Sequence, residues 1–567
     1  MRSSMIPPTG VTDTPERHPM PPGRWAQARW WAVAAACVVA ACTAWQACQV
    51  TRTPYPASYD YDEGVYAETA AAWAHGATPY RDVFLSQPPA FIAALRVAFL
   101  ASGTTIRTAR ATAIVASMVW LAALFSVAAA VGRPRAGLLA LCAAAGNFAF
   151  SLASHTVQTD APSEALSAAA VALAVLGSDS PALLWTAAGA VWGLAVLTKL
   201  TAVVSLVPLA MIALTTPPRA RRPEDAGAPV PDRGVAWRLT RLAALGLGTA
   251  AAVASFLPTI RTPAFLAQAV YYHLGAARAL GSHPAASVAA ILGFLVRAWP
   301  MSAAAALGGW ASIGAVRGVG WFRCAGASAR RQRYGGSHGA TFASPSRERS
   351  SWLAPILLAW LVAGSAALAG LTPLWPHHLL LLVSPLALLA GLGIDAVLDR
   401  IAGISPRLAV AVATCTAAAA TAYVVVGAGS VLESSSALRD ASEALARAVP
   451  AEGLVVTDDP MVPFLADRRA PPALIDTSLV RIQSRDLTEE SIENALSRRD
   501  VRAVVLWRGT FRSLLPRLAT CAATLFPIVV AEDGPRRVLA RDQGSQAAAS
   551  AAAARCHSMP APGGEQH

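Results

Sequence analysis

Two adjacent carboxylates are the residues of this sequence best suited to acid–base chemistry. Asp62 and Glu63 lie in the polar segment 59–89, directly after the first long apolar run, and tyrosines such as Tyr66 flank them. A carboxylate beside a bilayer surface is well placed to take a proton from an acceptor hydroxyl. The simpler alternative is a pair of hydrated loop carboxylates without a catalytic role. The sequence thus indicates a candidate general base and leaves both acids open for it.

Polar residues interrupt the apolar sequence at three later points. Asp160, close to His155, could act on substrate, but it also suits the start of a helix, where a carboxylate is favourable. Lys199 stands alone in a long apolar stretch, which is costly unless its ammonium reaches the membrane interface or binds an anion. The pair His377-His378 precedes an apolar run and would by itself indicate an interfacial turn. Lys199 is therefore a candidate for binding a phosphate group.

The composition places these residues in a membrane protein. Of 567 residues, 55% are hydrophobic and 14% are charged, whereas soluble domains carry nearer a quarter charged residues. Several apolar runs approach the length of about 20 residues that crosses a bilayer as a helix. The net charge of +13 comes largely from arginines in short loops, as in cytoplasmic loops of membrane proteins, so we do not expect nucleic-acid binding. The eight cysteines lack metal-ligand spacing, and we expect neither a metal nor a cofactor.

The order of apolar runs and basic loops predicts a topology. Apolar runs occupy residues 29–50, 88–102, 107–131, 136–154, 161–177, 182–199, 200–216, 239–257, 287–307, 351–371, 379–397 and 408–428. The basic loops 217–238 and 316–350 should be cytoplasmic. If the N-terminus is also cytoplasmic and all twelve runs span, both loops fall outside, so one of the early runs should not span. The run 88–102 is short and opens with two prolines, so it suits a helix lying along the membrane surface. We therefore expect a mainly α, polytopic protein with about eleven transmembrane helices and an external loop over 51–106.

The chain should divide into four parts. We expect 1–28 to be a disordered cytoplasmic N-terminus, 29–430 the transmembrane domain, 431–542 an external α/β domain and 543–567 a disordered tail. The segments "GLVVTDD", "RAVVLWR" and "FPIVVAED" are typical of short buried strands. Because this last domain shows no acid–base constellation, we expect it to help position the acceptor and to have little role in the chemistry.

Four of these segments together resemble a known family. The segment "YDEGVYAETAAAWAHGATPYRDVFLSQPP" is similar to the first external loop of the GT-C class of membrane glycosyltransferases. The segment "QTDAP" resembles their second acidic motif, "LTKLTAVVSLVP" their lysine-bearing span and "WPHHLLLLVSPLALLAG" a late motif. The bacterial relatives of the protein O-mannosyltransferases and the lipid A aminoarabinose transferases form the most similar group. The resemblance covers about residues 29–430.

The resemblance implies an activity and a location. Its members move a sugar from a polyprenyl-phosphate-linked donor to an extracytoplasmic hydroxyl acceptor, with inversion at the anomeric carbon. The partners would be that donor, a lipid, glycan or protein acceptor, and the lipids of the cell membrane. The family's nearest members need no metal.

The resemblance also implies roles for single residues. Asp62 matches the catalytic aspartate, with Glu63 as its competitor, and Asp160 matches the second acidic position. Lys199 matches a lysine near the donor phosphate. Many relatives carry Lys or His where this chain has Gln87, so a phosphate contact from that position is in doubt. The substitutes for it would be Arg81 and Arg261, and the expected substrate contacts are Tyr66, His155, Gln87, His377 and His378.

Two other classes of function compete with this interpretation. A multi-span transporter or lipid flippase would also bury charges in a helical bundle. Such proteins commonly show two related halves, and this sequence has no obvious internal repeat. An assembly protein without catalytic activity is the third possibility.

Overall fold

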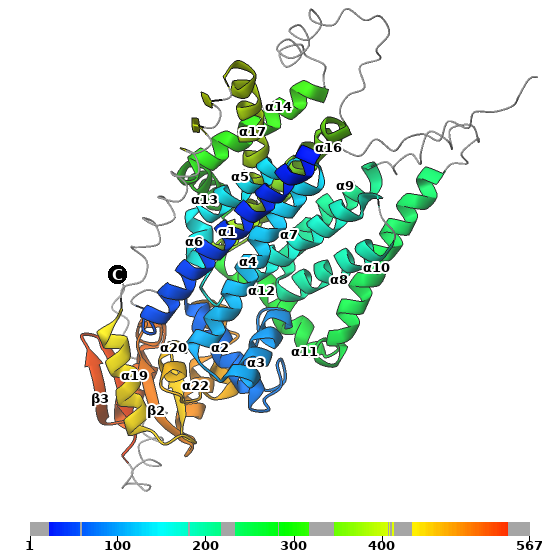
Figure 1. Cartoon of the computed structure of the whole chain (residues 1–567). Coiled ribbons are helices and arrows are strands. Elements are labelled where there is room, and N and C mark those ends of the chain that lie inside the picture. The colour runs from blue at the N-terminus through cyan, green and yellow to red at the C-terminus, as the bar shows by residue number, and fades with distance from the viewer. Residues whose placement is uncertain are drawn as a thin grey trace, which may run out of the picture.

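A long helical body with a smaller α/β unit at one end makes up the molecule (Figure 1). The computed structural model describes residues 22–56, 59–179, 182–216, 233–281, 283–316, 345–405, 407–408, 411–412, 415 and 434–542. Five predicted segments fall wholly or largely outside these residues: 1–28, 217–238, 316–350, 408–428 and 543–567.

The helical body is built from the residues predicted to form the transmembrane domain. Its helices are α1 (Pro22–Arg52), α2 (Tyr61–Ala74), α3 (Ala90–Ser102), α4 (Ile106–Ala130), α5 (Pro134–Ala145), α6 (Phe148–Ala153), α7 (Asp160–Leu176), η1 (Gly177–Asp179), α8 (Ala182–Thr198), η2 (Leu200–Ser205), α9 (Leu206–Thr215), α10 (Arg233–Ile260), α11 (Pro263–Leu266), η4 (Ala267–Tyr271), α12 (Tyr272–Leu280), α13 (Pro284–Arg297), α14 (Trp299–Val316), α16 (Pro345–Ala369), η6 (Pro376–Leu382) and α17 (Val383–Ile404).

Several of the expected spans are broken helices. Five helices among the described residues are long and apolar enough to cross a bilayer, or six if the bent pair 263–280 and 284–297 is one span. The expected span 136–154 divides into α5 and α6 because Asn147 caps the second helix with its side chain, which accepts from the N–H of Ala149 at 2.9 Å. The expected span 287–307 is likewise split between α13 and α14. The chain is thus a multi-pass membrane protein in which two of the expected spans, 136–154 and 287–307, are interrupted.

Small residues let the long helices approach closely. A Cβ on Gly189 of α8 would collide with the backbone carbonyl of Leu245 on α10, and a Cβ on Gly248 would collide with that of Thr186. Such glycine contacts replace the hydrophobic driving force that helices lack in lipid. The pair α8–α10 is therefore specified by glycine placement as well as by apolar composition.

Helices α2 and α3 lie at the end of the body beside the α/β unit (Figure 1). They share a separate apolar cluster in which Val65 of α2 and Ile92 of α3 are buried. Helix α3 has 13 residues, so it is too short to span, and it occupies most of the run 88–102 predicted to lie along the surface. This cluster fixes the start of α2 in place.

The C-terminal residues 436–540 form a mixed sheet covered by helices. Its elements are α19 (Ser436–Ala448), β1 (Leu454–Thr457), α20 (Met461–Leu465), η7 (Pro472–Leu474), α21 (Leu479–Gln483), α22 (Glu489–Leu496), β2 (Val501–Leu506), α23 (Thr510–Leu514), α24 (Pro516–Leu525), β3 (Ile528–Asp533) and β4 (Arg536–Ala540). The strand order is β1-β2-β4-β3, with β1 parallel to β2 and the other pairs antiparallel.

Alternation of side chains explains how the sheet is covered on both faces. Val455 of β1 and Val505 of β2 face the cluster that includes α19, whereas Val456 and Val504 face the cluster that includes α22 and α24. Strand β1 and most of β2 are therefore apolar on both faces, whereas β3 and β4 carry exposed charged residues. The sequence analysis did not predict β4, which follows β3 after a tight turn at Gly534 with φ of 56°.

Candidate active site

Asp62 lies in the first turn of α2, where the start of the helix holds it. The side chain of Asp60 caps the helix, and its Oδ1 accepts from the Asp62 N–H at 2.9 Å. One turn later, the Tyr66 hydroxyl donates to Asp62 Oδ2 at 3.4 Å. The Asp62 side chain is half-buried and that of Tyr66 is buried. Asp62 therefore has a fixed position and one free carboxylate oxygen among these contacts.

Glu63 has a different environment from its neighbour. Its two carboxylate oxygens accept from Arg110 Nε at 2.7 Å and Nη2 at 2.9 Å, and Oε1 also accepts from the Val157 N–H at 3.3 Å. Both members of the ion pair are almost fully buried, with side-chain exposures of 1% and 3%. The pair connects α2 to α4 and to the segment before α7. Such occupied oxygens suit a structural link better than a base.

Asp160 and Lys199 form a second buried ion pair. Lys199 Nζ donates to Asp160 Oδ2 at 2.6 Å, and the two side chains are 7% and 8% exposed. Asp160 begins α7, and Lys199 stands where α8 ends and η2 begins, with an extended backbone (φ −153°, ψ 132°). The break in the helix turns the ammonium toward Asp160. A charge pair held at such a site is costly in a membrane protein, which makes both residues candidates for a functional site.

The histidine pair of η6 joins the two acidic regions. Ligand atoms of Asp160, His377 and His378 lie within 4.8 Å of one another, close enough in principle to share a metal ion. His377 Nδ1 is 3.7 Å from Asp60 Oδ2 and 3.5 Å from Gln158 Nε2. Lys199 already provides Asp160 with a positive partner. The cluster therefore combines two carboxylates, an ammonium and imidazoles around one point.

The local charges shift the acidities at the start of α2. Burial and the Asp60 carboxylate raise the pKa of Asp62 to about 7, although His377 and Lys199 oppose the shift. Burial also acts to raise the pKa of Asp60, but a hydrogen bond from His377 and its charge outweigh this and lower it below its ordinary value. The pKa values of the two carboxyl groups are thus shifted in opposite directions. Asp62 is left with the acidity of a general base near neutral pH.

The sequence and the structure of the chain were compared with protein families and with solved structures. A family model for dolichyl-phosphate-mannose-protein mannosyltransferases matches residues 86–227, which include both Asp160 and Lys199. The crystal structure of ArnT from Cupriavidus metallidurans bound to undecaprenyl phosphate is similar with a TM-score of 0.58 at 16% identity, covering 91% of this chain and 98% of that chain. The apo structure of ArnT gives 0.54 at 17% identity over the same shares. The resemblance to the GT-C class is confirmed. No curated protein matches the sequence significantly.

The GT-C fold does not bring every predicted residue to this cluster. Arg81 is exposed and its guanidinium pairs with the neighbouring Asp82 at 2.7 Å. Arg261 is exposed just after the end of α10. Gln87 contributes its backbone carbonyl to the Tyr80 hydroxyl at 2.8 Å. None of these three has a described contact with Asp160 or Lys199, so their role at the donor phosphate stays a prediction.

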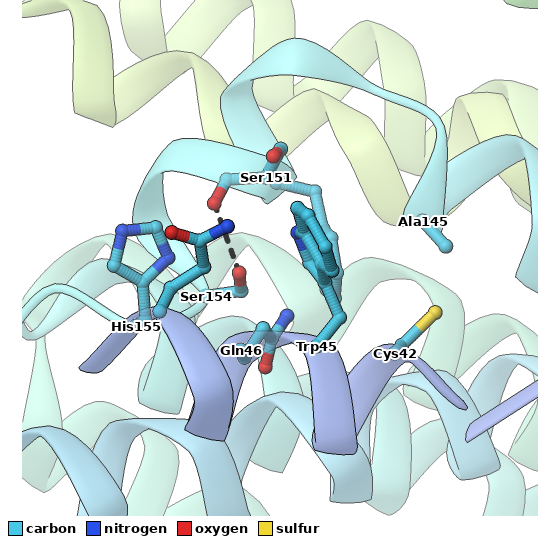
Figure 2. A pocket seen from close by; sticks show the side chains of 9 residues that line it. Cys42, Trp45, Gln46, Ala145, Ser151, Ser154 and His155 are labelled. Carbon is cyan, nitrogen blue, oxygen red and sulfur yellow. Dashed lines mark hydrogen bonds between the residues drawn. The ribbon is translucent and has the colours of Figure 1, made fainter. Parts of the chain in front are cut away.

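His155 lies beside the first helix of the GT-C body. Figure 2 shows its side chain lining a small pocket with Trp45 and Gln46 of α1, where Ser154 Oγ donates to the Ser151 carbonyl at 3.0 Å. The pocket volume is about 20 Å³, enough for roughly one water molecule. The predicted contact of His155 with substrate would require this pocket to open.

Sequence reasoning missed three polar residues of this cluster. Asp60 and Gln158 each lie two residues before a predicted acid. Asp60 belongs to the polar segment 59–89 and Gln158 opens the motif "QTDAP", so both could have been found there. Asp476 comes from the C-terminal domain, and its carboxylate is among the charges that act on Asp62. No signal in the sequence joins it to a residue more than 400 positions earlier.

Proposed function

We propose that the chain is an integral membrane glycosyltransferase that moves a sugar from a polyprenyl-phosphate-linked donor to an extracytoplasmic hydroxyl acceptor. The observation that carries the proposal is the cluster at the start of α2 and α7. In it the Lys199 ammonium and the His377 imidazole, which suit a phosphate, act on a carboxylate with a pKa of about 7, Asp62. The ArnT structure with undecaprenyl phosphate and the mannosyltransferase family model support the class of donor.

The reaction needs one displacement at the anomeric carbon. Asp62 would take the proton of the acceptor hydroxyl, and the acceptor oxygen would then form its bond to that carbon. The bond from the carbon to the phosphate oxygen breaks, and the polyprenyl phosphate leaves with the electron pair. Lys199 and His377 would stabilise its developing negative charge. Attack from the side opposite the leaving group inverts the configuration.

The other candidates take supporting roles in this proposal. Asp160 holds the Lys199 ammonium and orients the site, Tyr66 orients Asp62, and His378 contacts the substrate beside His377. We assign Glu63 to the ion pair with Arg110 and not to proton transfer. We assign the positive charge at the phosphate to side chains and propose no metal or cofactor. Acceptors of all three kinds, lipid, glycan and protein, fit an external hydroxyl.

A direct assay tests this function. Membranes containing the chain are incubated with a panel of radiolabelled polyprenyl-phosphate sugars, and the labelled product is separated and identified. We expect label on an acceptor from at least one donor, together with free polyprenyl phosphate in equal amount. Label that stays on intact donor for the whole panel would contradict the proposal.

Lys199 should govern donor binding. The variant Lys199→Met keeps the apolar stem and removes the charge. Loss of a charge-assisted hydrogen bond to the phosphate should weaken donor binding about 10-fold to 100-fold. The measurement is a titration of purified protein with donor. The double variant Lys199→Met with Asp160→Asn is the matched control, because it removes the unpaired carboxylate that the single variant leaves buried. Donor affinity equal to wild type in both variants would remove Lys199 from the phosphate site.

The proposed topology places the site on the external face. We propose about eleven spans, a cytoplasmic N-terminus, an external C-terminal domain and cytoplasmic loops at 217–238 and 316–350, because arginines concentrate in those loops. In a cysteine-free background, Ser337→Cys should resist an impermeant thiol reagent in intact cells. Ser102→Cys, at the exposed end of α3, should react. Strong labelling of Ser337→Cys from outside would overturn the orientation.

A further inference from the structure

The C-terminal domain packs directly onto the helix that carries Asp62. The Tyr59 hydroxyl donates to Asp459 Oδ2 at 2.6 Å, and Arg508 pairs with the same carboxylate at 3.2 Å while donating to the Tyr59 carbonyl at 3.1 Å. The backbones of α2 and α20 also approach closely at Gly64, because a Cβ added there would lie 2.6 Å from the Met461 backbone nitrogen. The domain is therefore in fixed contact with α2 on both sides of Asp62.

One turn of this domain reaches the residue next to the proposed base. The Tyr61 hydroxyl accepts from the Thr477 N–H at 2.7 Å and lies 3.5 Å from Asp476 Oδ1. The turn is itself fixed, because Asp476 Oδ1 accepts from the Ser478 N–H at 2.9 Å and Thr477 Oγ1 donates to the Thr457 carbonyl at the end of β1 at 2.8 Å. Asp476 is 6% exposed and Thr477 is fully buried. The position of Tyr61 is thus set by the C-terminal sheet.

Asp62 faces charged groups from several elements at once. The titratable groups acting on it or bonded to it are Asp60 and Tyr66 of its own segment, His377 of η6, Lys199 between α8 and η2, and Asp476 of the C-terminal domain. Burial, Asp60 and Asp476 raise the pKa of Asp62, whereas His377 and Lys199 lower it. The C-terminal domain therefore contributes one of the two carboxylates that oppose ionisation of Asp62.

We propose that Asp476 and Thr477 are positioning residues for Asp62: they hold Tyr61 and place a carboxylate of the C-terminal domain beside the base. The inference rests on the proposed function of Asp62. It replaces the expectation that this domain has little role in the chemistry. A domain that only bound the acceptor would not need hydrogen bonds to Tyr61, the residue adjacent to the proposed base. Substrate would not touch these residues, which act through Tyr61 and Asp62.

The pH dependence of transfer separates this role from a merely structural one. Asp476→Asn keeps an oxygen that can accept from Ser478 and removes the negative charge. Since that charge raises the pKa of Asp62, its loss should move the acidic limb of the rate profile to lower pH. The matched control is Asp500→Asn in the same domain, where the carboxylate is exposed and pairs with Arg498; its limb should coincide with wild type. An unshifted limb in Asp476→Asn would overturn the inference.

An activity-independent measurement tests the inference even where no transfer is detected. The infrared carboxyl band of Asp62 is isolated as the difference between each protein and its Asp62→Asn counterpart, and is titrated in wild type and in Asp476→Asn. We expect a lower midpoint in Asp476→Asn. Equal midpoints would refute the inference, while a lower midpoint without any transfer would leave the inference standing and count against the proposed function.

Tyr61→Phe tests the positioning role even if Asp476→Asn does not fold. It deprives the buried Thr477 N–H of its acceptor and removes the hydrogen bonds between Tyr61 and the turn. Misplacement of a catalytic group can cost about 10²-fold in rate, so kcat should fall up to that extent with donor affinity unchanged. A kcat equal to wild type in Tyr61→Phe would contradict the positioning role.

Discussion

Asp62→Asn is expected to insert, fold and bind donor like wild type, and to transfer sugar about 10²–10⁴-fold more slowly, the usual worth of a general base. The amide keeps the shape of the side chain and can still accept from the Tyr66 hydroxyl, but it cannot take a proton. Single-turnover transfer at saturating donor measures the effect, because it excludes product release.

The control for Asp62→Asn is Asp440→Asn, an exposed acid on α19 whose loss should not change the rate. In wild type, the base form of Asp62 prevails only above its pKa of about 7, so transfer should fall as pH drops through that value. A wild-type rate from Asp62→Asn would show that another group accepts the proton.

Glu63→Gln should have its largest effect on stability. It leaves the buried Arg110 guanidinium without its counter-charge, and breaking a buried pair in this way costs about 3–5 kcal/mol. We expect a clearly lower Tm and a lower yield of folded protein in detergent. Any protein that folds should keep its donor affinity, because Glu63 has no described contact with Lys199 or His377.

A double variant separates charge from contact at this position. Glu63→Gln combined with Arg110→Met removes both charges, and it should recover part of the lost stability because no uncompensated charge remains. If Glu63→Gln were as stable as wild type and lost only turnover, the result would identify Glu63 as the general base in place of Asp62.

Motif spacing predicted several residues that the structure brings together, whereas their roles stay predictions. Asp160, Lys199 and His377 meet although they are far apart in sequence, as the resemblance to a four-motif family implied. The distinction between Asp62 and Glu63 depends on Arg110, and a single sequence does not show which of two adjacent acids an arginine 47 residues later will bind.

The fold was predictable where local patterns decide it. Apolar runs marked most of the helices, and three segments contained strands of the C-terminal sheet. The break at Lys199 coincides with the division between the apolar runs 182–199 and 200–216. The break before Asn147 depends on a side-chain cap, so composition alone did not indicate it. The contacts of Tyr59 and Tyr61 with Asp459 and Thr477 join parts of the chain about 400 residues apart, and no local signal predicts them.

Cleavage of the sugar–phosphate bond in proteoliposomes tests the central claim most directly. Wild type and Asp62→Asn are each reconstituted with donor labelled in both sugar and phosphate, and the fate of the two labels is followed across a range of pH. The account predicts that wild type separates the labels with an acidic limb near pH 7, and that Asp62→Asn binds donor but leaves the labels together. Intact donor crossing the bilayer at the same rate with both proteins, its labels never separated, would contradict the account and indicate a lipid transporter.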